Sequence, residues 1–156
     1  MKINIPGFGN VEIHHVVCDY NGTLAVDGHV KDCIKQAIQD LSSEIQFHVI
    51  TADTFGVVEK ELEGVSCTLT IIPKGAQAQA KADYIRRLGP DHVIAVGNGV
   101  NDKLMLSESR IGIAVLLEEG TSVSAMTAAD ILVKDILNAF EYLKKPGRLV
   151  ATLRNA

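Results

Sequence analysis

Aromatic residues are scarce in this sequence, and tryptophan is absent. Aromatics make up 4% of the 156 residues, and 15 Lys and Arg stand against 19 Asp and Glu, so that the formal charge is −4. Domains that bind nucleic acids usually combine a basic face with aromatic side chains that stack on bases. The composition therefore predicts that nucleic acid is not the partner.

Long apolar runs are also missing. No stretch approaches 18 consecutive apolar residues, and the start, MKINIPGFGN, lacks the apolar segment of a secretory signal. Cys18, Cys33 and Cys67 show no CxxC spacing, which favours reduced structural thiols over a metal site or disulfide. We therefore expect a soluble, cytoplasmic protein that does not contact a membrane.

Hydrophobic residues, at 47%, are plentiful enough for one core, and the length predicts a single domain over 1–156. Apolar, β-branched runs alternate with segments of helical period. Strands are expected at 11–20, 47–53, 66–73, 92–98, 110–117 and 128–133, and helices at 29–43, 55–64, 76–89, 101–109 and 135–154, the last broken near Pro146. This order predicts an α/β fold, a Rossmann-like three-layer sandwich with a mainly parallel sheet and helices on both faces.

The N-terminal stretch INIPGFGNVEI departs from that alternation. Two extended pieces flank Pro-Gly and Gly-Asn turn residues. We expect a β-hairpin here that adds an antiparallel edge strand to the sheet.

Three polar positions follow predicted strands. In open α/β sheets the ligand lies beyond the carboxyl ends of the strands, where strand order reverses. That rule selects Asp19, Thr51 and the loop after Val96. Thr51 alone means little, because Ser and Thr often end strands.

The stretch VVCDYNGTL places Asp19 at a strand end, before a turn at Asn21 and Gly22 whose backbone N–H groups could face an anion. A carboxylate there could attack phosphorus or bind a metal, or it could simply cap a turn. In the helix that follows the third strand, Lys81 could reach a phosphate or be a surface lysine. Lys74 is its competitor.

The stretch VGNGVND, residues 96–102, begins like the dinucleotide fingerprint GxGxxG, but Asp102 stands where the third glycine belongs. A carboxylate at that helix start would repel a pyrophosphate. Asn98 and Asp102 suit a hard cation such as Mg²⁺ better, although Asn101 or Asp102 could also merely cap the helix.

The order of these signals is specific: strand then DxNGT, strand then Thr, a helical Lys, and strand then GNGxND. It resembles the haloacid dehalogenase superfamily. Within it, the sequence is most similar to the phosphorylation domain of P-type cation-transporting ATPases and small soluble proteins related to it, whose signatures are DKTGT and GDGxND. The resemblance covers essentially the whole chain, including GIAV at 112–115 and the run that follows.

The resemblance implies Mg²⁺-dependent phosphoryl transfer through an aspartyl-phosphate. Asp19 would be the nucleophile, and the backbone carbonyl of Asn21 a metal ligand. Thr51 would bind the phosphoryl oxygens with the turn at Gly22, and a lysine, preferably Lys81, would neutralise them. Asn98 and Asp102 would hold Mg²⁺ directly or through water. These parts supply the in-line nucleophile and charge neutralisation that the reaction needs.

Two amides depart from the pattern. Phosphatases of the superfamily usually carry an Asp at the position of Asn21, as general acid and then base, and an amide does neither at neutral pH. Such a loss costs on the order of 10² to 10⁴ in rate, so we expect slow turnover of poor leaving groups. Asn98 replaces the first Asp of GDG, which predicts weaker Mg²⁺ binding.

Inserted cap domains are not expected. Only 28 residues separate Thr23 from Thr51, and 30 separate Thr51 from Lys81. The resemblance then implies an open crevice, for a phosphorylated small molecule or a phosphoprotein, which another copy of the chain could cover. The two motif amides leave an alternative open: a catalytically reduced binding or regulatory protein that keeps the fold.

Overall fold

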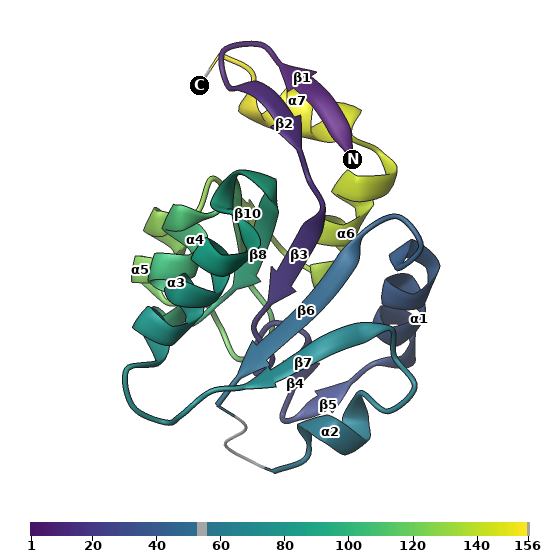
Figure 1. The fold of residues 1–156 in the computed structure, drawn as a ribbon, viewed down its shortest axis with the longest axis vertical. Helices are drawn as coiled ribbons and strands as arrows, with labels where there is room; N and C mark the ends of the chain where they lie inside the picture. The colour runs from purple at the N-terminus through teal and green to yellow at the C-terminus, as the bar shows by residue number, and fades with distance from the viewer. Residues whose placement is uncertain (53–55, 156) are drawn as a thin grey trace.

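The computed structural model describes residues 1–52 and 56–155, and its centre is a six-stranded sheet (Figure 1). The strand order is β10-β9-β8-β3-β6-β7, and every neighbouring pair is parallel. The strands are β3 (His15–Cys18), β6 (Gln46–Thr51), β7 (Cys67–Ile71), β8 (Val93–Gly97), β9 (Ile111–Val115) and β10 (Ile131–Val133). The predicted α/β fold with a parallel sheet is confirmed.

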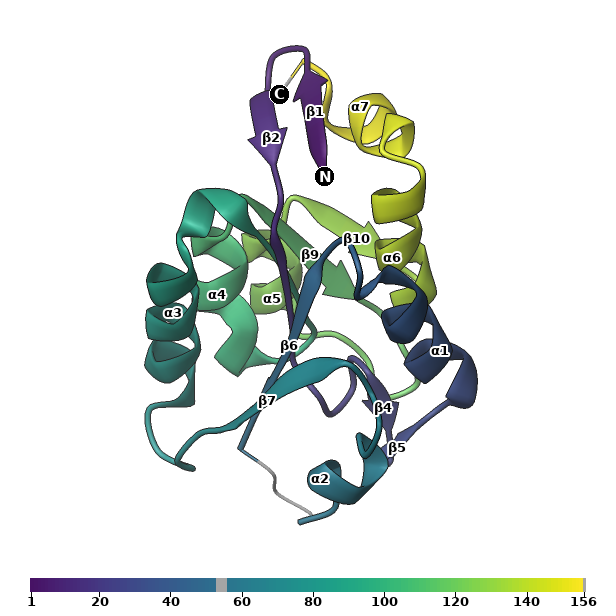
Figure 2. The ribbon, with the colours of Figure 1, turned by 45° about the vertical axis from the view of Figure 1, so that its right-hand side comes forward.

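Helices cover both faces of this sheet (Figure 2). One apolar cluster contains the buried residues of α1 (Asp32–Leu41) and α6 (Ile136–Lys144), and a second contains Ile85 of α3 (Gln77–Leu88) with the buried residues of α4 (Lys103–Glu108) and α5 (Val123–Ala128). Strand β3 contributes to both clusters, Val16 and Cys18 to the first and Val17 to the second. Its side chains alternate because successive residues of a strand point to opposite faces.

The strand order reverses beside β3. The chain passes from β3 to β6 and β7 on one side and then returns to β8, which pairs with the other edge of β3. The loops after β3 and β8 therefore diverge at the carboxyl ends of the strands, where a crevice for a ligand forms in such sheets. Asp19 and Asn98 begin these two loops.

The N-terminal hairpin is present, but it does not join the central sheet. Strands β1 (Lys2–Ile5) and β2 (Gly9–Glu12) pair with each other alone, in a sheet of two strands. The prediction of an added edge strand, and of one strand over 11–20, was wrong. Only two residues link β2 to β3, which is paired on both sides, so the hairpin cannot reach the free edges of the sheet at β7 and β10. The hairpin instead packs beside α7 (Gly147–Leu153), as the upper part of Figure 1 shows.

A second short hairpin occupies the start of the helix expected at 29–43. Strands β4 (Ala25–Val26) and β5 (His29–Val30) pair antiparallel, and α1 begins only at Asp32. The two turn residues, Asp27 and Gly28, both have positive φ, at 52° and 81°. An Asp-Gly pair is the usual sequence of such a turn, so this hairpin had a signal in the sequence.

The remaining elements differ from expectation mainly in extent. The helix expected at 55–64 is the short α2 (Val58–Glu61), and residue 55 lies outside the described residues. Short 3-10 helices, η1 (Pro90–His92) and η2 (Val100–Asp102), flank β8, and α5 was not predicted. The closing helix is broken at Pro146, as expected. Within the described parts of the chain, no helix combines the length and apolar character that a membrane crossing requires.

Candidate active site

Asp19 lies directly after β3, at the carboxyl edge of the sheet, and is 7% exposed. Its backbone N–H donates to the Val96 carbonyl, so the hydrogen bonding between β3 and β8 continues one residue beyond the end of β3. Burial and the charge of Asp102 raise the pKa of Asp19 to about 7, against the opposing effect of Lys81. At the mouth of the crevice, the fold therefore holds a carboxylate whose ionised form is disfavoured by burial and by a neighbouring negative charge.

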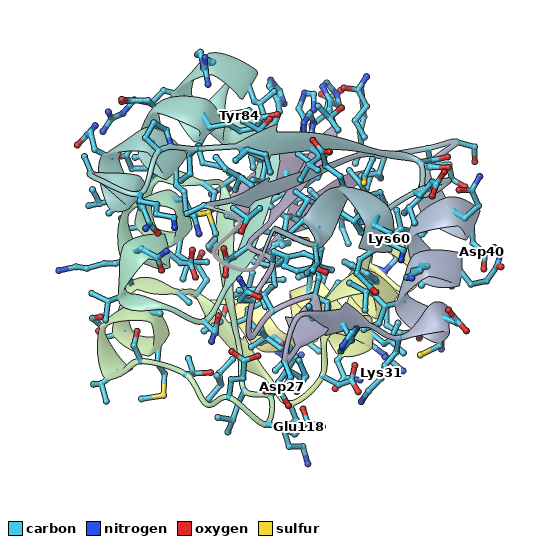
Figure 3. All side chains as sticks on the ribbon, turned by 90° about the horizontal axis from the view of Figure 1, so that it is seen from below. Asp27, Lys31, Asp40, Lys60, Tyr84 and Glu118 are labelled. Atoms are coloured by element: carbon cyan, nitrogen blue, oxygen red, sulfur yellow. The ribbon has the colours of Figure 1, made fainter. Side chains whose placement is uncertain are left out.

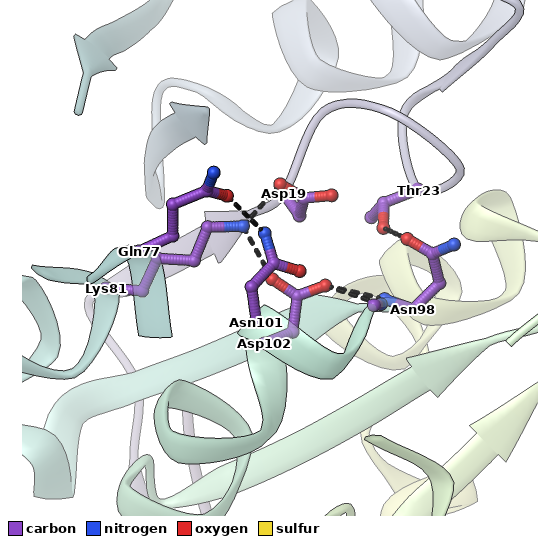
Figure 4. A network of polar contacts seen from close by, with 8 residues as sticks. Asp19, Thr23, Gln77, Lys81, Asn98, Asn101 and Asp102 are labelled. Atoms are coloured by element: carbon purple, nitrogen blue, oxygen red, sulfur yellow. Dashed lines mark hydrogen bonds and ion pairs between the residues drawn. The ribbon is translucent and has the colours of Figure 1, made fainter. Parts of the chain in front are cut away.

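Lys81 supplies the positive charge that faces this carboxylate. It lies on the buried side of α3 and is 0% exposed, and its Nζ is 2.5 Å from Asp19 Oδ1 and 2.6 Å from Asp102 Oδ1 (Figure 4). Burial acts to lower the pKa of Lys81, but the charges of Asp102 and Asp19 outweigh it and raise the pKa above its usual value. This buried ammonium lies beside Asp19, where it can also bind the negative charge of a ligand.

Lys74, the competing lysine, is exposed on the loop before α3. Its backbone carbonyl accepts a hydrogen bond from Gln77 Nε2, 3.1 Å away. Gln77 and Lys81 lie four residues apart on α3, so both point to the same side of the helix. The structure therefore brings Lys81, not Lys74, to Asp19.

Asp102 caps the turn that follows β8. Its Oδ2 accepts hydrogen bonds from the backbone N–H groups of Asn98 and Gly99, at 2.9 and 2.8 Å, while Oδ1 faces Lys81. A side chain on Gly97 would approach the Asp102 side chain to 2.6 Å, so the strand must end in glycine here. Asp102 therefore caps this turn, as the sequence suggested, and also contacts Lys81 at the site.

Asn98 joins three segments of the chain. Its Oδ1 accepts from the Thr23 hydroxyl at 3.1 Å, and its Nδ2 donates to the Gly120 carbonyl at 3.0 Å. The backbone N–H of Ser122 donates to the Asn98 carbonyl. The amide therefore ties the turn after Asp19 to the loop after β9, which Figure 4 shows in part.

Gly22 makes this close approach possible. It has a φ of +74°, and an added Cβ would lie 2.2 Å from Asn98 Nδ2. No other residue fits this position without moving Asn98. The glycine of DYNGT is therefore explained by the shape of the turn.

Asn21 has a buried side-chain oxygen. Among the described residues, its Oδ1 is the one buried side-chain nitrogen or oxygen atom without a hydrogen-bond partner. Buried polar atoms are nearly always bonded, so this oxygen marks a place where a ligand or water belongs. Thr51, at the end of the neighbouring β6, is 2% exposed.

Two contacts at the site had not been expected. Asn101 Nδ2 donates to Gln77 Oε1 at 2.8 Å, which links η2 to α3 beside Lys81. Glu119 Oε1 accepts from the Asp27 backbone N–H at 2.9 Å, which links the loop after β9 to the β4-β5 hairpin at the rim. The i, i+4 spacing of Gln77 and Lys81 was a signal for the first contact; the second needed the fold.

The rim of the crevice carries charges of both signs. Viewed from the carboxyl end of the sheet, Asp27, Lys31 and Glu118 lie close together (Figure 3). Lys31 Nζ is 3.8 Å from Glu118 Oε1, and both side chains are largely exposed. Exposed pairs of this kind contribute little to stability, so the rim is held by its backbone contacts.

A divalent cation would find only oxygen donors here. The described residues contain no group of three or more His, Cys, Asp or Glu side chains that could hold a metal ion. The site offers the carboxylates of Asp19 and Asp102, amide oxygens and backbone carbonyls, together with the unpartnered Asn21 Oδ1. An oxygen donor set with two carboxylates fits Mg²⁺, which keeps several waters when it binds proteins.

No protein-family model matches the chain. Its sequence is 36% identical over 85 residues to an uncharacterized protein of Methanocaldococcus jannaschii, covering 52% of this chain and 91% of that protein. It is 29% identical over 159 residues to the cadmium, zinc and cobalt-transporting ATPase of Bacillus subtilis, covering 94% of this chain but 22% of the transporter. A soluble P-type ATPase-like phosphatase of M. jannaschii is 29% identical over 129 residues, with 79% and 46% covered.

Solved structures show the same fold. A 3-deoxy-D-manno-octulosonate 8-phosphate phosphatase from Moraxella catarrhalis, in complex with magnesium and phosphate ions, aligns with a TM-score of 0.69 at 18% identity over 91% of this chain and 94% of that one. The cobalt-bound deoxy-D-mannose-octulosonate 8-phosphate phosphatase from Haemophilus influenzae aligns with a TM-score of 0.71 at 13% identity, over 91% of this chain and 93% of that one.

The chain has the fold of these phosphatases, which agrees with the resemblance to the haloacid dehalogenase superfamily that its motifs predict. Its sequence is similar to P-type ATPases and to a soluble P-type ATPase-like phosphatase. The chain spans less than a quarter of the Bacillus transporter and less than half of the soluble phosphatase, so their activities are not carried over by similarity alone.

Proposed function

We propose that this protein is a phosphohydrolase or phosphotransferase that forms an aspartyl-phosphate on Asp19. The observation that carries the proposal is Lys81, which is fully buried and contacts both Asp19 and Asp102. Burying an ammonium between two carboxylates costs several kcal/mol of desolvation for each ion, and stability alone gives little reason to retain it. The resemblance to the haloacid dehalogenase superfamily, the similarity to a soluble phosphatase and the fold shared with solved phosphatases support the same activity.

In the proposed reaction, one Asp19 carboxylate oxygen attacks the phosphorus in line with the leaving group. Lys81 turns from the carboxylate toward the equatorial phosphoryl oxygens and neutralises them, while the Thr51 hydroxyl and the Asn21 backbone N–H hold those oxygens in place. The Gly22 N–H, which the sequence suggested for the same role, donates to the Ala25 carbonyl at 2.8 Å instead. Asp102 stays fixed by its two backbone donors and keeps Lys81 oriented.

We propose Mg²⁺ as the cofactor, held by Asp19, the backbone carbonyl of Asn21, Asn98 and Asp102. The bound cation would supply charge neutralisation on the phosphoryl oxygens. Asn98 would contribute an oxygen to the cation but no negative charge. Its Oδ1 also accepts from the Thr23 hydroxyl and its Nδ2 donates to the Gly120 carbonyl, and these contacts hold the side chain in place.

We propose a phosphorylated small molecule or a phosphoprotein as the substrate. Neither residues 24–50 nor the described residues between Thr51 and Lys81 form more than short strands and helices, which supports an open crevice in a single domain without a cap. Val100 and Val123 are 67% and 69% exposed next to the site. We propose that a second copy of the chain covers them, which light scattering would detect as a dimer or larger assembly.

We place this activity in the cytoplasm. All three cysteines are free thiols, and burial raises the pKa of the Cys18 thiol. Free thiols persist in reducing compartments.

The test is phosphate release from acetyl phosphate and from p-nitrophenyl phosphate, with and without Mg²⁺. We expect release from acetyl phosphate that needs Mg²⁺ and is lost in Asp19→Asn, which keeps the size of the side chain and removes the nucleophile. The control, Asn138→Asp on the exposed side of α6, should act like wild type. Release that survives in Asp19→Asn would overturn the proposal.

A second candidate is a binding or regulatory protein that keeps the pocket without turnover. The observation that favours it is the pair of amides at positions 21 and 98, neither of which is an acid, a base or a charged metal ligand. It predicts that phosphate or Mg²⁺ raises the melting temperature although no phosphate is released from either donor.

A further inference from the structure

The two outer strands of the central sheet differ in how their free edges are protected. β10 has three residues, Ile131–Val133, and lies between the charged Asp130 and Lys134. β7 has five residues, Cys67–Ile71, and the whole run VSCTLTIIP over 65–73 contains no charged residue. Short strands and nearby charges are common protections of a sheet edge, so β10 is protected in this way and β7 is not.

The outer edge of β7 carries open backbone groups. Its inner edge pairs with β6, and the Ile72 N–H continues this pairing to the Thr51 carbonyl at 2.8 Å. Thr70 is in phase with Ile72, because alternate residues of a strand turn their N–H and C=O groups to the same edge. The groups of Leu69 and Ile71 therefore point outward, where no other described strand pairs with them. Figure 2 shows β7 in front of β6, with α3 on one side and α1 on the other.

The side chains of β7 suit pairing with a further strand. Ile71 is 46% exposed, Thr68 is exposed, and Leu69 is half-buried. β-branched residues such as Ile and Thr fit a pleated sheet. An uncharged strand with an open edge is a template for uncontrolled association, so a specific partner strand is expected here.

A second copy of the chain supplies a strand that matches. In an antiparallel arrangement centred on Leu69, all five residues of β7 overlap, and the outward groups of the two Leu69 residues face each other. Thr68 then faces Thr70 of the second copy, and Cys67 faces Ile71. Hydroxyl groups meet hydroxyl groups and apolar side chains meet apolar side chains, which are favourable pairs across strands.

The charges beyond the two ends of β7 favour the same partner and the same direction. Glu63 lies shortly before the strand and Lys74 shortly after it, and both are exposed. In an antiparallel pair, the start of one strand lies beside the end of the other, so each Lys74 comes near Glu63 of the second copy. A parallel pair would bring like charges together. Opposite charges across an interface fix its direction and register.

We propose that β7 pairs antiparallel with β7 of a second copy of this chain, so that the two six-stranded sheets form one continuous sheet. A two-fold axis at Leu69 relates the copies, which is the commonest symmetry of protein dimers. Backbone hydrogen bonds make the pairing, and Lys74 and Glu63 align its ends. This inference does not rest on the proposed activity, because β7 contributes no residue to the site.

The two crevices of this dimer open in opposite directions. Strands of the two sheets run antiparallel, and Asp19 follows the carboxyl end of β3 in each copy. Both crevices therefore stay accessible to a large phosphorylated partner. The exposed Val100 and Val123 belong to a different surface, since α5 packs against β9 and η2, on the other half of the sheet from β7.

Light scattering during gel filtration tests the dimer. We expect wild type to have at least twice the 16.8 kDa mass of one chain, and Ile71→Lys to halve the mass of wild type. Leu132→Lys is the matched control, because Leu132 is 47% exposed on the other outer strand, and this variant should keep the wild-type mass. A wild type with the mass of one chain, or an Ile71→Lys protein with the wild-type mass, would overturn the inference.

Two further variants separate loss of the interface from loss of the fold. Ile71→Thr is polar but uncharged and β-branched, so it should still dimerise. Thr68→Lys places the charge on the other face of the strand and should halve the mass as Ile71→Lys does. Far-UV circular dichroism should match wild type in each case. Folded Thr68→Lys protein that keeps the wild-type mass would overturn the inference even if Ile71→Lys unfolds.

Cysteine cross-linking tests the direction of the two strands. In a background of Cys33→Ser and Cys67→Ser, one protein carries Thr68→Cys and another carries Thr70→Cys. Pairing centred on Leu69 places each position 68 opposite position 70 of the second copy, within reach of a disulfide. Oxidation of the mixture should therefore give cross-linked dimers, and oxidation of either protein alone should not. Cross-links in the separate proteins but not in the mixture would overturn the antiparallel arrangement.

Reversing the end charges tests the complementarity. Lys74→Glu and Glu63→Lys each bring like charges together at both ends of the paired strands, so each should raise the dissociation constant severalfold in analytical ultracentrifugation. The double variant restores opposite charges and should recover the wild-type constant. A double variant as weak as the single ones would overturn this register.

Val123→Lys separates the β7 dimer from contacts beside the crevice. It should leave the β7 pairing intact, so that its mass still halves when Ile71→Lys is added. If Val123→Lys alone gives single chains and Ile71→Lys does not, the inference is overturned and the contact between copies lies at α5. Neither result bears on the proposed function, which phosphate release measures separately.

Discussion

The two ends of the central strands both bury polar side chains, but in opposite electrostatic states. At the carboxyl end, Lys81 lies between Asp19 and Asp102 and makes two ion pairs. At the amino end, His15 Nδ1 lies 3.1 Å from His48 Nε2, and His48 continues to another hydrogen-bond partner. One end buries charges, and the other buries the neutral ring of His48 beside the half-buried ring of His15.

That partner is the hydroxyl of Tyr84, 2.8 Å from His48 Nδ1. A neutral imidazole has one donor and one acceptor nitrogen, which one such chain of contacts satisfies. Burial lowers the pKa of His48 to about 4, with His15 adding to the effect. The same physical cause raises the pKa of Asp19.

The difference shows where the fold carries an electrostatic cost. The histidines avoid the desolvation cost of a buried charge because they stay neutral. The carboxyl end keeps its charges, and their ion-pair partners offset that cost. A site of that kind is prepared to bind an anion or a cation, and the histidine end is not.

Removing Lys81 should have the largest effect. Lys81→Met keeps the length of the side chain but leaves two buried carboxylates facing each other, which should cost roughly 3–5 kcal/mol of unfolding free energy and abolish charging by acetyl phosphate. Urea titration measures the loss of unfolding free energy, and Lys74→Met is the control. The exposed Lys74 should change stability by no more than about 0.5 kcal/mol. Equal midpoints for the two variants would contradict the ion-pair account.

Gly22→Ala should follow in size. Its matched control is Gly64→Ala, which has almost the same φ, +76° against +74°, but no atom within 4 Å of the added Cβ. Left-handed backbone alone costs roughly 1–2 kcal/mol. We expect Gly64→Ala to lose that amount and Gly22→Ala clearly more, because Asn98 must move. Chemical denaturation compares them, and similar losses would contradict the close packing of the turn.

The histidine end predicts a pH dependence of stability. Because the folded pKa of His48 lies below its unfolded value, the unfolded chain takes up a proton first as the pH falls. The stability contributed by His48 is present above about pH 6.5 and is lost as the pH falls toward 4, on the order of 2 kcal/mol in all. His48→Gln should flatten this part of the unfolding free energy against pH. An unchanged slope would mean that other groups cause it.

Asn98→Asp should have the smallest effect, and its sign should depend on Mg²⁺. Without Mg²⁺, a carboxylate cannot donate to the Gly120 carbonyl, so we expect a loss of about 1 kcal/mol. With Mg²⁺, the added charge should make the cation raise the melting temperature more than in wild type. Asn101→Asp, bonded to Gln77, is the control. Equal Mg²⁺ shifts for position 98 and wild type would argue against a cation beside Asn98.

Much of the fold could be predicted because the order of strands and helices fixes a parallel sheet. The strand ends then pointed to Asp19, Thr51 and Asn98, and the structure places each at the carboxyl edge. Their roles in catalysis and metal binding stay predictions.

Other features could not be predicted, for physical reasons. That β1-β2 stays apart from the central sheet follows from its short link to β3, which lies in the middle of the sheet and is paired on both edges, and this position is a property of the whole topology. The contacts of Asn98 with Thr23 and Gly120 join segments far apart in sequence. The β4-β5 hairpin was missed although Asp27-Gly28 marked it, because the apolar period of α1 extended backward over His29 and Val30.

The most direct test of the central claim is to localise the phosphoryl group. Wild-type protein treated with acetyl phosphate and Mg²⁺, quenched in acid and fragmented in a mass spectrometer should carry one phosphoryl group on Asp19, and Asp19→Asn should carry none. A phosphoryl group on another residue, or one that remains in Asp19→Asn, would contradict the account.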